Sequence, residues 1–194
     1  MSEARIGPNA IIRVAEALTQ MRGRAVAADV FAAAGLSDAL REPPQGMVPE
    51  VQVVRLHAAL RGLLGVPTAR AIGAEAGRRT AHYLLGHRVP RPLVLLLPRL
   101  PAWLSARVLL SAISRHSWTF AGSAAFSARV ARPVEVGLAG CAICRGAHEP
   151  GPLCDYYGET LAGLFRALVS RDCQAAQVSC AAAGASACRF ELAW

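Results

Sequence analysis

A chain of 194 residues, with 54% hydrophobic and 18% charged residues, can bury a sizeable core, and this composition excludes a disordered chain. The net charge is +8, and all 21 basic residues are arginine, so chemistry that needs a lysine amine is also excluded. The arginines are scattered rather than clustered with aromatic residues, which argues against nucleic acid as a partner.

The N-terminal region is predicted to be helical. Apolar residues at helical spacing predict four helices, over residues 8–18, 25–34, 50–64 and 69–85. Gly35 is suited to cap the second helix, and the turn residues of 41–46 predict a loop. Gly65-Val66-Pro67 separates the last two helices.

The most apolar stretch, residues 93–113, is interrupted by prolines and arginines and is therefore not predicted to span a membrane. We interpret it as a buried helix pair or the wall of a pocket, with contact to a membrane surface as the alternative. The N-terminus carries Glu3 and no uninterrupted apolar run, so we predict no secretory signal and a cytoplasmic protein.

The sequence period changes after Ser114. Alternating, β-branched and aromatic residues predict short strands over residues 118–120, 125–130, 134–138, 175–181 and 188–192. Residues 158–169 return to helical spacing. This order predicts an α+β fold, in which N-terminal helices pack on an antiparallel sheet of about four to five strands with one crossing helix. We expect residues 1–48 to form a helical extension and residues 49–194 to form the main, ligand-binding domain.

All six cysteines fall in the last third of the chain: Cys141, Cys144, Cys154, Cys173, Cys180 and Cys188. In a reducing cytosol they are expected to be metal ligands or core residues rather than disulfides. Cys141 and Cys144 have CxxC spacing, but the absence of a second CxxC excludes a standard zinc ribbon. The alternative is that all six are buried small residues or surface thiols.

Two C-terminal stretches resemble the signature of the 4-vinyl-reductase domain family. Residues 152–159 (PLCDYYGE) place a Cys before a Gly-bearing helix, and residues 180–192 (CAAAGASACRFEL) contain a Cys, a Gly and a final Cys-x-Phe. Residues 73–84 resemble the Gly-rich amphipathic helix of the family, so the resemblance covers about residues 50–194. Residues 144–146 and 187–190 look most like the branch encoded with bacteriochlorophyll genes. The resemblance implies a TRAPP-like/4-vinyl-reductase fold.

The resemblance also implies a structural zinc site. Relatives in phenol-sensing transcription activators hold zinc with three cysteines and one glutamate, and those cysteines map onto Cys154, Cys180 and Cys188. The glutamate position is Gln177 here, and a neutral amide is a poor zinc ligand. We therefore expect Cys144 to supply the fourth thiolate, with His148 as a substitute. Cys141 and Cys173 are then expected to be core residues.

The bacteriochlorophyll branch implies a tetrapyrrole ligand of the Mg-protoporphyrin or divinyl chlorophyllide type. Such a ligand needs an apolar wall, for which the leucines of residues 84–97 are candidates, and arginines for its propionates. The candidate ligand-binding residues are Arg78, Arg79, His82, Arg88, Trp103 and Trp118. The alternatives are a solvated basic helix face for the arginines, core packing for Trp118 and an ordinary polar role for the histidine.

A vinyl reductase needs a hydride donor or an electron relay, and the sequence contains neither a strand–GxGxxG–helix unit nor a common ferredoxin spacing. We therefore expect a protein that binds and hands over a tetrapyrrole without reducing it, as a homodimer that supports Mg-chelatase or another pigment-biosynthesis enzyme. The alternatives are an 8-vinyl reductase of divinyl chlorophyllide that uses an external reductant, and a small-molecule sensor or interaction module.

Overall fold

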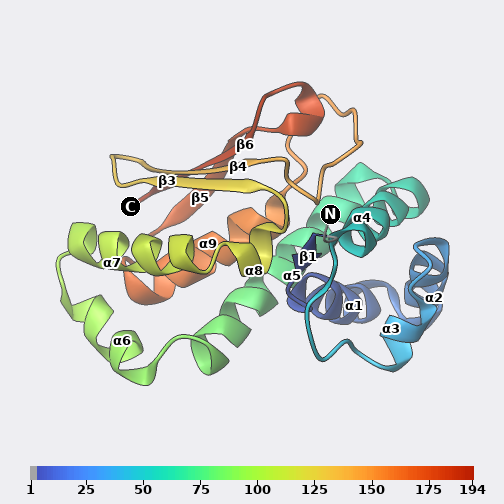
Figure 1. The fold of residues 1–194 in the computed structure, drawn as a ribbon, viewed down its shortest axis with the longest axis horizontal. Helices are drawn as coiled ribbons and strands as arrows, with labels where there is room; N and C mark the ends of the chain where they lie inside the picture. The colour runs from blue at the N-terminus through green and yellow to red at the C-terminus, as the bar shows by residue number, and fades with distance from the viewer. Residues whose placement is uncertain (1–3) are drawn as a thin grey trace.

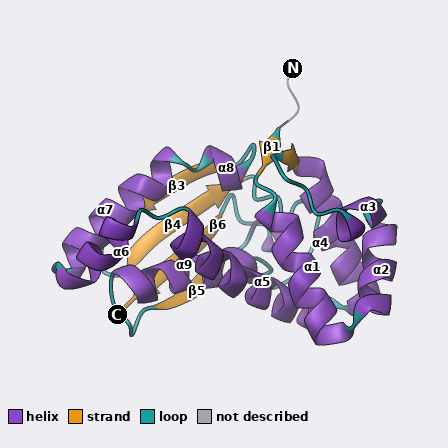
Figure 2. Ribbon diagram, turned by 90° about the horizontal axis from the view of Figure 1, so that it is seen from below, coloured by secondary structure: helices purple, strands orange, loops and turns teal. Residues whose placement is uncertain are grey.

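The computed structural model describes residues 4–194 and places a bundle of helices beside an antiparallel sheet (Figures 1 and 2). The helical half consists of β1 (Arg5–Ile6), α1 (Asn9–Arg22), α2 (Arg24–Ala33), α3 (Ser37–Arg41), β2 (Val48–Pro49), α4 (Glu50–Leu64) and α5 (Val66–His87). The two short strands β1 and β2 pair antiparallel, which ties the start of the chain to the start of α4.

The second half begins with three short helical pieces: α6 (Arg91–Leu96), η1 (Leu97–Arg99) and α7 (Ala102–Arg115). It continues with α8 (Trp118–Ala121), β3 (Ala125–Arg129), β4 (Val134–Ala139), α9 (Asp155–Leu168), β5 (Gln174–Ser179), η2 (Ala181–Ala183) and β6 (Cys188–Ala193). The four long strands form one antiparallel sheet in the order β3-β4-β6-β5. The predicted α+β class is confirmed.

The sheet buries one face. Val136 of β4 pairs with Phe190 of β6, and both are buried, as are their neighbours two residues away on each strand. Phe190 lies under Gly158 of α9, so α9 is the crossing helix that covers this face (Figure 2). The alternation of apolar residues in the sequence therefore records which side of each strand faces α9.

Helices α5 and α9 pack unusually closely because glycines occupy their contact. A Cβ atom on Gly77 would lie 2.4 Å from the Tyr156 carbonyl oxygen, and one on Gly163 would lie 2.6 Å from the Ala81 Cβ. Any larger side chain at either position would push the helices apart. The Gly-rich character of this helix, noted from the sequence, thus has a packing cause.

The strand predicted over residues 118–120 is wrong, because these residues form the helical turn α8. The backbone N–H of Ala121 donates to the Ser117 carbonyl at 2.7 Å, and Gly122, with φ +61°, ends the turn. Aromatic and β-branched residues favour strands only weakly, and here local hydrogen bonds override that preference.

The apolar segment 93–113 is divided among α6, η1 and α7 at its prolines, and within residues 4–194 no helix is long and apolar enough to cross a bilayer. A single hydrophobic core joins the two halves of the chain, since Leu18 and Phe31 belong to the same buried cluster as Leu56 and Phe165. The boundary near residue 48 stays a prediction.

Candidate functional site

Four cysteines converge where β4, α9 and β6 meet. Cys141 and Cys144 lie in the loop after β4, Cys154 precedes the first turn of α9, and Cys188 begins β6. All four are buried, and their sulfur atoms all lie within 4.8 Å of one another. The shortest Sγ–Sγ distances are 3.4 Å for Cys144–Cys188, 3.5 Å for Cys141–Cys154 and 3.6 Å for Cys154–Cys188.

These distances suit a metal ion. Four thiolates at about 2.3 Å from a tetrahedral metal have sulfur atoms roughly 3.8 Å apart, whereas a disulfide brings them to about 2.05 Å. The four cysteines can therefore hold a metal ion with a modest expansion. Hydrogen bonding from Cys141, Cys154 and Cys188 lowers the pKa of the Cys144 thiol, which favours a first thiolate there.

Local structure explains why these residues meet. Antiparallel pairing of β4 with β6 places Leu138 opposite Cys188, and the chain then turns at Gly140, whose φ is +85°. The turn brings Cys141 back toward the end of the sheet. The backbone N–H of Ala181 donates to the Cys188 sulfur at 3.4 Å, a contact that would stabilise a thiolate there.

Of the predicted ligands, Cys144, Cys154 and Cys188 belong to this group, and its fourth member is Cys141. Cys180 is buried beside it. Hydrogen bonding to Cys154, together with the backbone N–H groups of Ala182 and Leu153, lowers the pKa of Cys180 to about 6.

Cys173 is buried apart from the cysteine group, and burial raises the pKa of its thiol to about 11. His148 is exposed and is not a member of the group.

Gln177 has a structural part in the site. Its Oε1 accepts the backbone N–H of Cys154 at 2.9 Å, and its Nε2 donates to the Ser179 carbonyl at 3.1 Å. Both ends of the amide are therefore used to fix the start of α9 against β5.

Two arginines tie the cysteine loop to α4, and no sequence pattern singled them out. The half-buried Arg61 donates to the Ile143 carbonyl at 2.8 Å. Burial lowers the pKa of Arg61, while the nearby thiols of Cys144 and Cys154 act in the opposite direction. A guanidinium in this position offsets negative charge on a cluster of thiolates.

The second arginine, Arg145, forms a two-pronged ion pair with the buried Glu50, with N–O distances of 2.9 and 3.0 Å. Ser123 adds a hydroxyl donor at 2.7 Å. Burial raises the pKa of Glu50, but the hydrogen bonds from Arg145 and Ser123 outweigh this effect and leave the pKa below its usual value. The loop that carries Cys144 is thereby joined to the first turn of α4.

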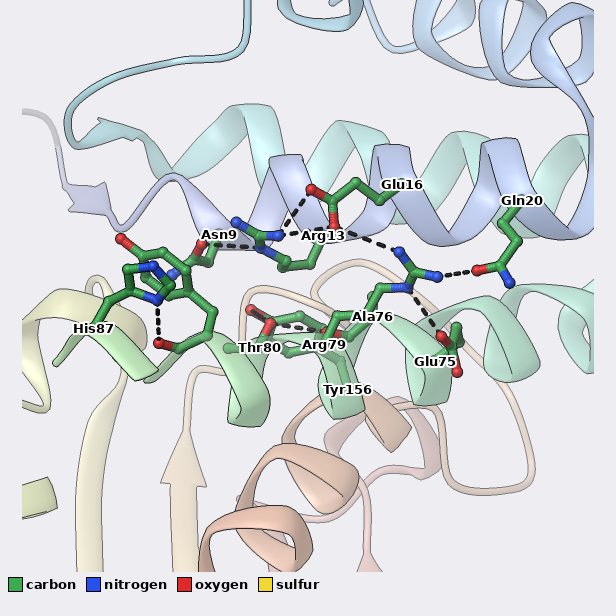
Figure 3. Close-up of polar contacts among 11 residues, drawn as sticks. Asn9, Arg13, Glu16, Gln20, Glu75, Ala76, Arg79, Thr80, His87 and Tyr156 are labelled. Carbon is green, nitrogen blue, oxygen red and sulfur yellow. Dashed lines mark hydrogen bonds and ion pairs between the residues drawn. The ribbon is translucent and has the colours of Figure 1, made fainter. Parts of the chain in front are cut away.

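Arg78 and Arg79, predicted to bind ligand, are members of an ion-pair chain that joins α1, α5 and α9. Arg79 contacts Glu75 at 2.9 Å and Glu16 at 3.6 Å (Figure 3). Arg78 contacts Glu75 at 3.0 Å and Glu159 at 3.7 Å. Both guanidinium groups are therefore already paired with carboxylates.

The other predicted ligand-binding residues, His82, Arg88, Trp103 and Trp118, are exposed. Trp103 and Trp118 lie near opposite ends of α7, which separates them by about 20 Å at roughly 1.5 Å per residue. The two tryptophans therefore face separate regions of the surface.

A groove of about 870 Å³ runs between α1, α2, α3 and α5. Its apolar lining includes Ile12, Ala15 and Leu40, and its basic lining consists of Arg24, Arg41 and Arg79. We call it the helical groove. Among the predicted ligand-binding residues, Arg79 is the one that lines it.

The sheet and the cysteine group together define a class of protein. Residues 134–193, which contain all six cysteines, match the family model of the vinyl-4-reductase domain, the family that the sequence motifs resemble. The class is therefore that of proteins with a 4-vinyl-reductase domain.

Two curated relatives match nearly the whole chain. The bacteriochlorophyll synthase 23 kDa chain of Cereibacter sphaeroides is 40% identical over 188 residues, which is 97% of this chain and 90% of that protein. The protein of the same name from Rhodobacter capsulatus is 34% identical over 98% of this chain and 87% of its own length. The chain belongs to the family of these 23 kDa chains.

The fold is shared more widely. An H-NOX protein from S. oneidensis, solved in the Fe(II)NO ligation state, superimposes with a TM-score of 0.56 at 11% identity, over 96% of this chain and 98% of that chain. A second H-NOX structure, from work on heme distortion in that family, gives 0.54 at 16% identity, over 97% and 95%. At these identities the likeness establishes the fold alone.

Proposed function

We propose that this protein acts in bacteriochlorophyll synthesis by binding a tetrapyrrole intermediate, of the Mg-protoporphyrin or divinyl chlorophyllide type, and handing it over without reducing it. The observation that carries the proposal is the 40% identity, over 97% of the chain, to a protein named as a chain of bacteriochlorophyll synthase. The H-NOX neighbour studied for heme distortion supports a fold that is compatible with a porphyrin.

We assign the tetrapyrrole to the helical groove. Its volume lies in the range usual for small-molecule sites, and its apolar floor lies beside basic side chains. Arg24 makes no ion pair with any residue in the described part of the chain, so its guanidinium is available to a propionate. Arg41 pairs with the exposed Asp38, in a contact that contributes little.

We further propose that the metal is zinc and that it is structural. Four buried thiols converging from a loop, a helix start and a strand are typical of closed zinc sites, with no position left for substrate. When bound, zinc would supply a cross-link between the cysteine loop, α9 and β6. Cys141 is the proposed fourth ligand, and the sequence-based alternative is Cys180.

Handover requires a receiving protein, which we infer to be Mg-chelatase or another pigment-biosynthesis enzyme. We also infer a homodimer formed through the helical half, where Met21 and Leu63 are exposed. Light scattering during the titration described next measures the oligomeric state, and a strict monomer would contradict that inference.

The binding proposal is tested by titrating the protein with Mg-protoporphyrin and following its absorption and fluorescence. Arg24→Ala should raise the Kd about tenfold, the effect of losing one charge-assisted contact of about 1.4 kcal/mol. Arg171→Ala removes an exposed arginine outside the groove and should leave the Kd unchanged. Equal Kd values for all three proteins would refute the groove as the site.

A second arm separates handover from catalysis. The protein is incubated with divinyl chlorophyllide and NADPH, and the pigments are analysed. We expect unchanged divinyl pigment bound to the protein. Repeated turnover to the monovinyl product by this chain alone would establish the 8-vinyl reductase alternative instead.

A further inference from the structure

The segment α6–η1–α7 exposes large apolar side chains at the end of the molecule opposite α2 and α3 (Figures 1 and 2). The exposed fraction is 63% for Leu95, 50% for Leu96 and 55% for Trp103. We call these three residues the apolar tip. Single exposed apolar residues are common, but three within nine positions form a patch.

The tip is held out by a fixed anchor. Leu97, next in sequence, is buried in the core, and its carbonyl accepts the hydroxyl of the buried Ser105 at 2.6 Å. This bond joins η1 to the first turns of α7. Because Leu97 points inward, Leu95 and Leu96 are left on the outside, so their exposure is a consequence of the fold.

The tip lies in a segment without acidic residues. Between Glu75 and Glu135 the sequence contains nine arginines and no aspartate or glutamate. Five of these arginines are exposed and make no ion pair with any residue between 4 and 194: Arg88, Arg91, Arg99, Arg107 and Arg115. By contrast, Arg78, Arg79 and Arg129 of the same segment are paired with carboxylates.

We propose that the apolar tip and the arginines around it form a docking surface for an anionic lipid bilayer. Leucine and tryptophan side chains insert at the boundary between headgroups and acyl chains, and arginines reach lipid phosphates from the same depth. Basic residues near an anionic surface strengthen binding additively. The positive charge of the segment selects a negatively charged surface, and its short helices lie on the bilayer without crossing it.

The experiment is flotation of the full chain with vesicles of phosphatidylglycerol and phosphatidylcholine, compared with pure phosphatidylcholine vesicles. We expect at least about tenfold more bound protein on the anionic vesicles, with binding weakened by salt. The double variant Leu95→Ser/Leu96→Ser should reduce binding to anionic vesicles by about tenfold or more. So should the charge variant Arg91→Glu/Arg99→Glu.

The matched control is Leu63→Ser, which removes a leucine of similar exposure, 55%, from α4 and should bind vesicles like the unaltered protein. Equal binding to both vesicle types, or tip variants that bind normally, would overturn the proposal. So would light scattering that shows a dimer converted to a monomer by the tip variants alone, because the tip would then be an interface between copies. Mg-protoporphyrin binding by the same variants is measured separately and should be unchanged.

Discussion

Glu50 joins two segments that are far apart in the sequence. Its carboxylate is buried and accepts hydrogen bonds from Arg145 and Ser123, whereas Arg145 remains partly accessible to water. A buried carboxylate with such partners stabilises the fold only while it is ionised.

Replacing Glu50 with Gln should lower the free energy of unfolding by about 2 kcal/mol at pH 7, because hydrogen bonds to a charged group are lost and Arg145 is left unpaired. The folded-state pKa of Glu50 lies below its unfolded value. Its contribution is therefore fully present above the unfolded pKa and disappears as the pH falls through the folded pKa. Urea unfolding should show the gap between the two proteins narrowing in acid.

The control for this variant is Glu135→Gln, which removes an exposed carboxylate paired with the exposed Arg129. It should change the free energy of unfolding by less than about 0.5 kcal/mol. A Glu50→Gln deficit that stays constant from neutral to acidic pH would contradict the assignment.

At this scale the sequence predicts residue types better than partners. The cysteines were identifiable as ligands because thiol chemistry is rare and their positions are clustered. Arg61 and Glu50 were not, because the first contacts Ile143 and the second contacts Arg145, 82 and 95 positions away. Nothing local distinguishes an arginine that supports a thiolate cluster from one that faces solvent.

Helix α5 contains two glycines whose environments differ. Gly77 faces α9 at a distance that excludes a Cβ atom, whereas a Cβ on Gly86 would meet nothing within 4 Å. Both lie within the helix, so their backbone preferences are similar. The pair therefore separates the packing role of glycine from its helix propensity.

Gly77→Ala should destabilise the protein by about 2 kcal/mol, because the new methyl group overlaps the Tyr156 carbonyl. Gly86→Ala should stabilise it by up to about 1 kcal/mol, because alanine is the better helix former. Thermal and urea unfolding measure both changes. Changes of the same sign would show that the α5–α9 contact is looser than described.

Element prediction succeeded where one face of an element is apolar over several turns or strand residues. The helices near residues 8–18, 50–64 and 69–85 and the four strands of the main sheet are present close to their expected bounds. It failed at Trp118, where the element is too short for a period to decide between a strand and a turn. The order of the strands could not be read from periodicity, because pairing depends on long-range contacts.

For the whole molecule, the cysteine group is a place where three separate segments could be linked by a single ion. Removal of the metal by a chelator should lower the melting temperature by about 10 °C, because binding to the folded state alone adds its free energy to stability. Metal analysis should find about one zinc per chain. Protein prepared without oxygen that contains no metal and keeps its melting temperature would refute the site.

Substitution with Co(II) identifies the ligands, because its absorption reports the number of thiolates. Cys141→Ser should change this spectrum, while Cys180→Ser should leave it unchanged. The reverse result would favour the ligand set expected from the sequence. Cys173→Ser is the neutral control, since Cys173 lies outside the group.

The sequence-based ligand set and the observed group share three cysteines and differ in the fourth. The difference has a physical origin. Cys141 and Cys180 both adjoin Cys154, and only the path of the turn after β4 decides which sulfur comes within 4.8 Å of the other three. That path depends on Gly140 and on the two arginine anchors, whose long-range contacts leave no mark in the local sequence.

The spacing of the four sulfur atoms has one more consequence, which concerns oxidation. Without an ion, the thiols stand in two close pairs, Cys141 with Cys154 and Cys144 with Cys188. Each pair needs to approach by only about 1.4 Å to reach disulfide length. Air and metal therefore compete for the same four atoms, and protein that loses its ion under oxidising conditions becomes unable to take it back until a reductant reopens the bridges.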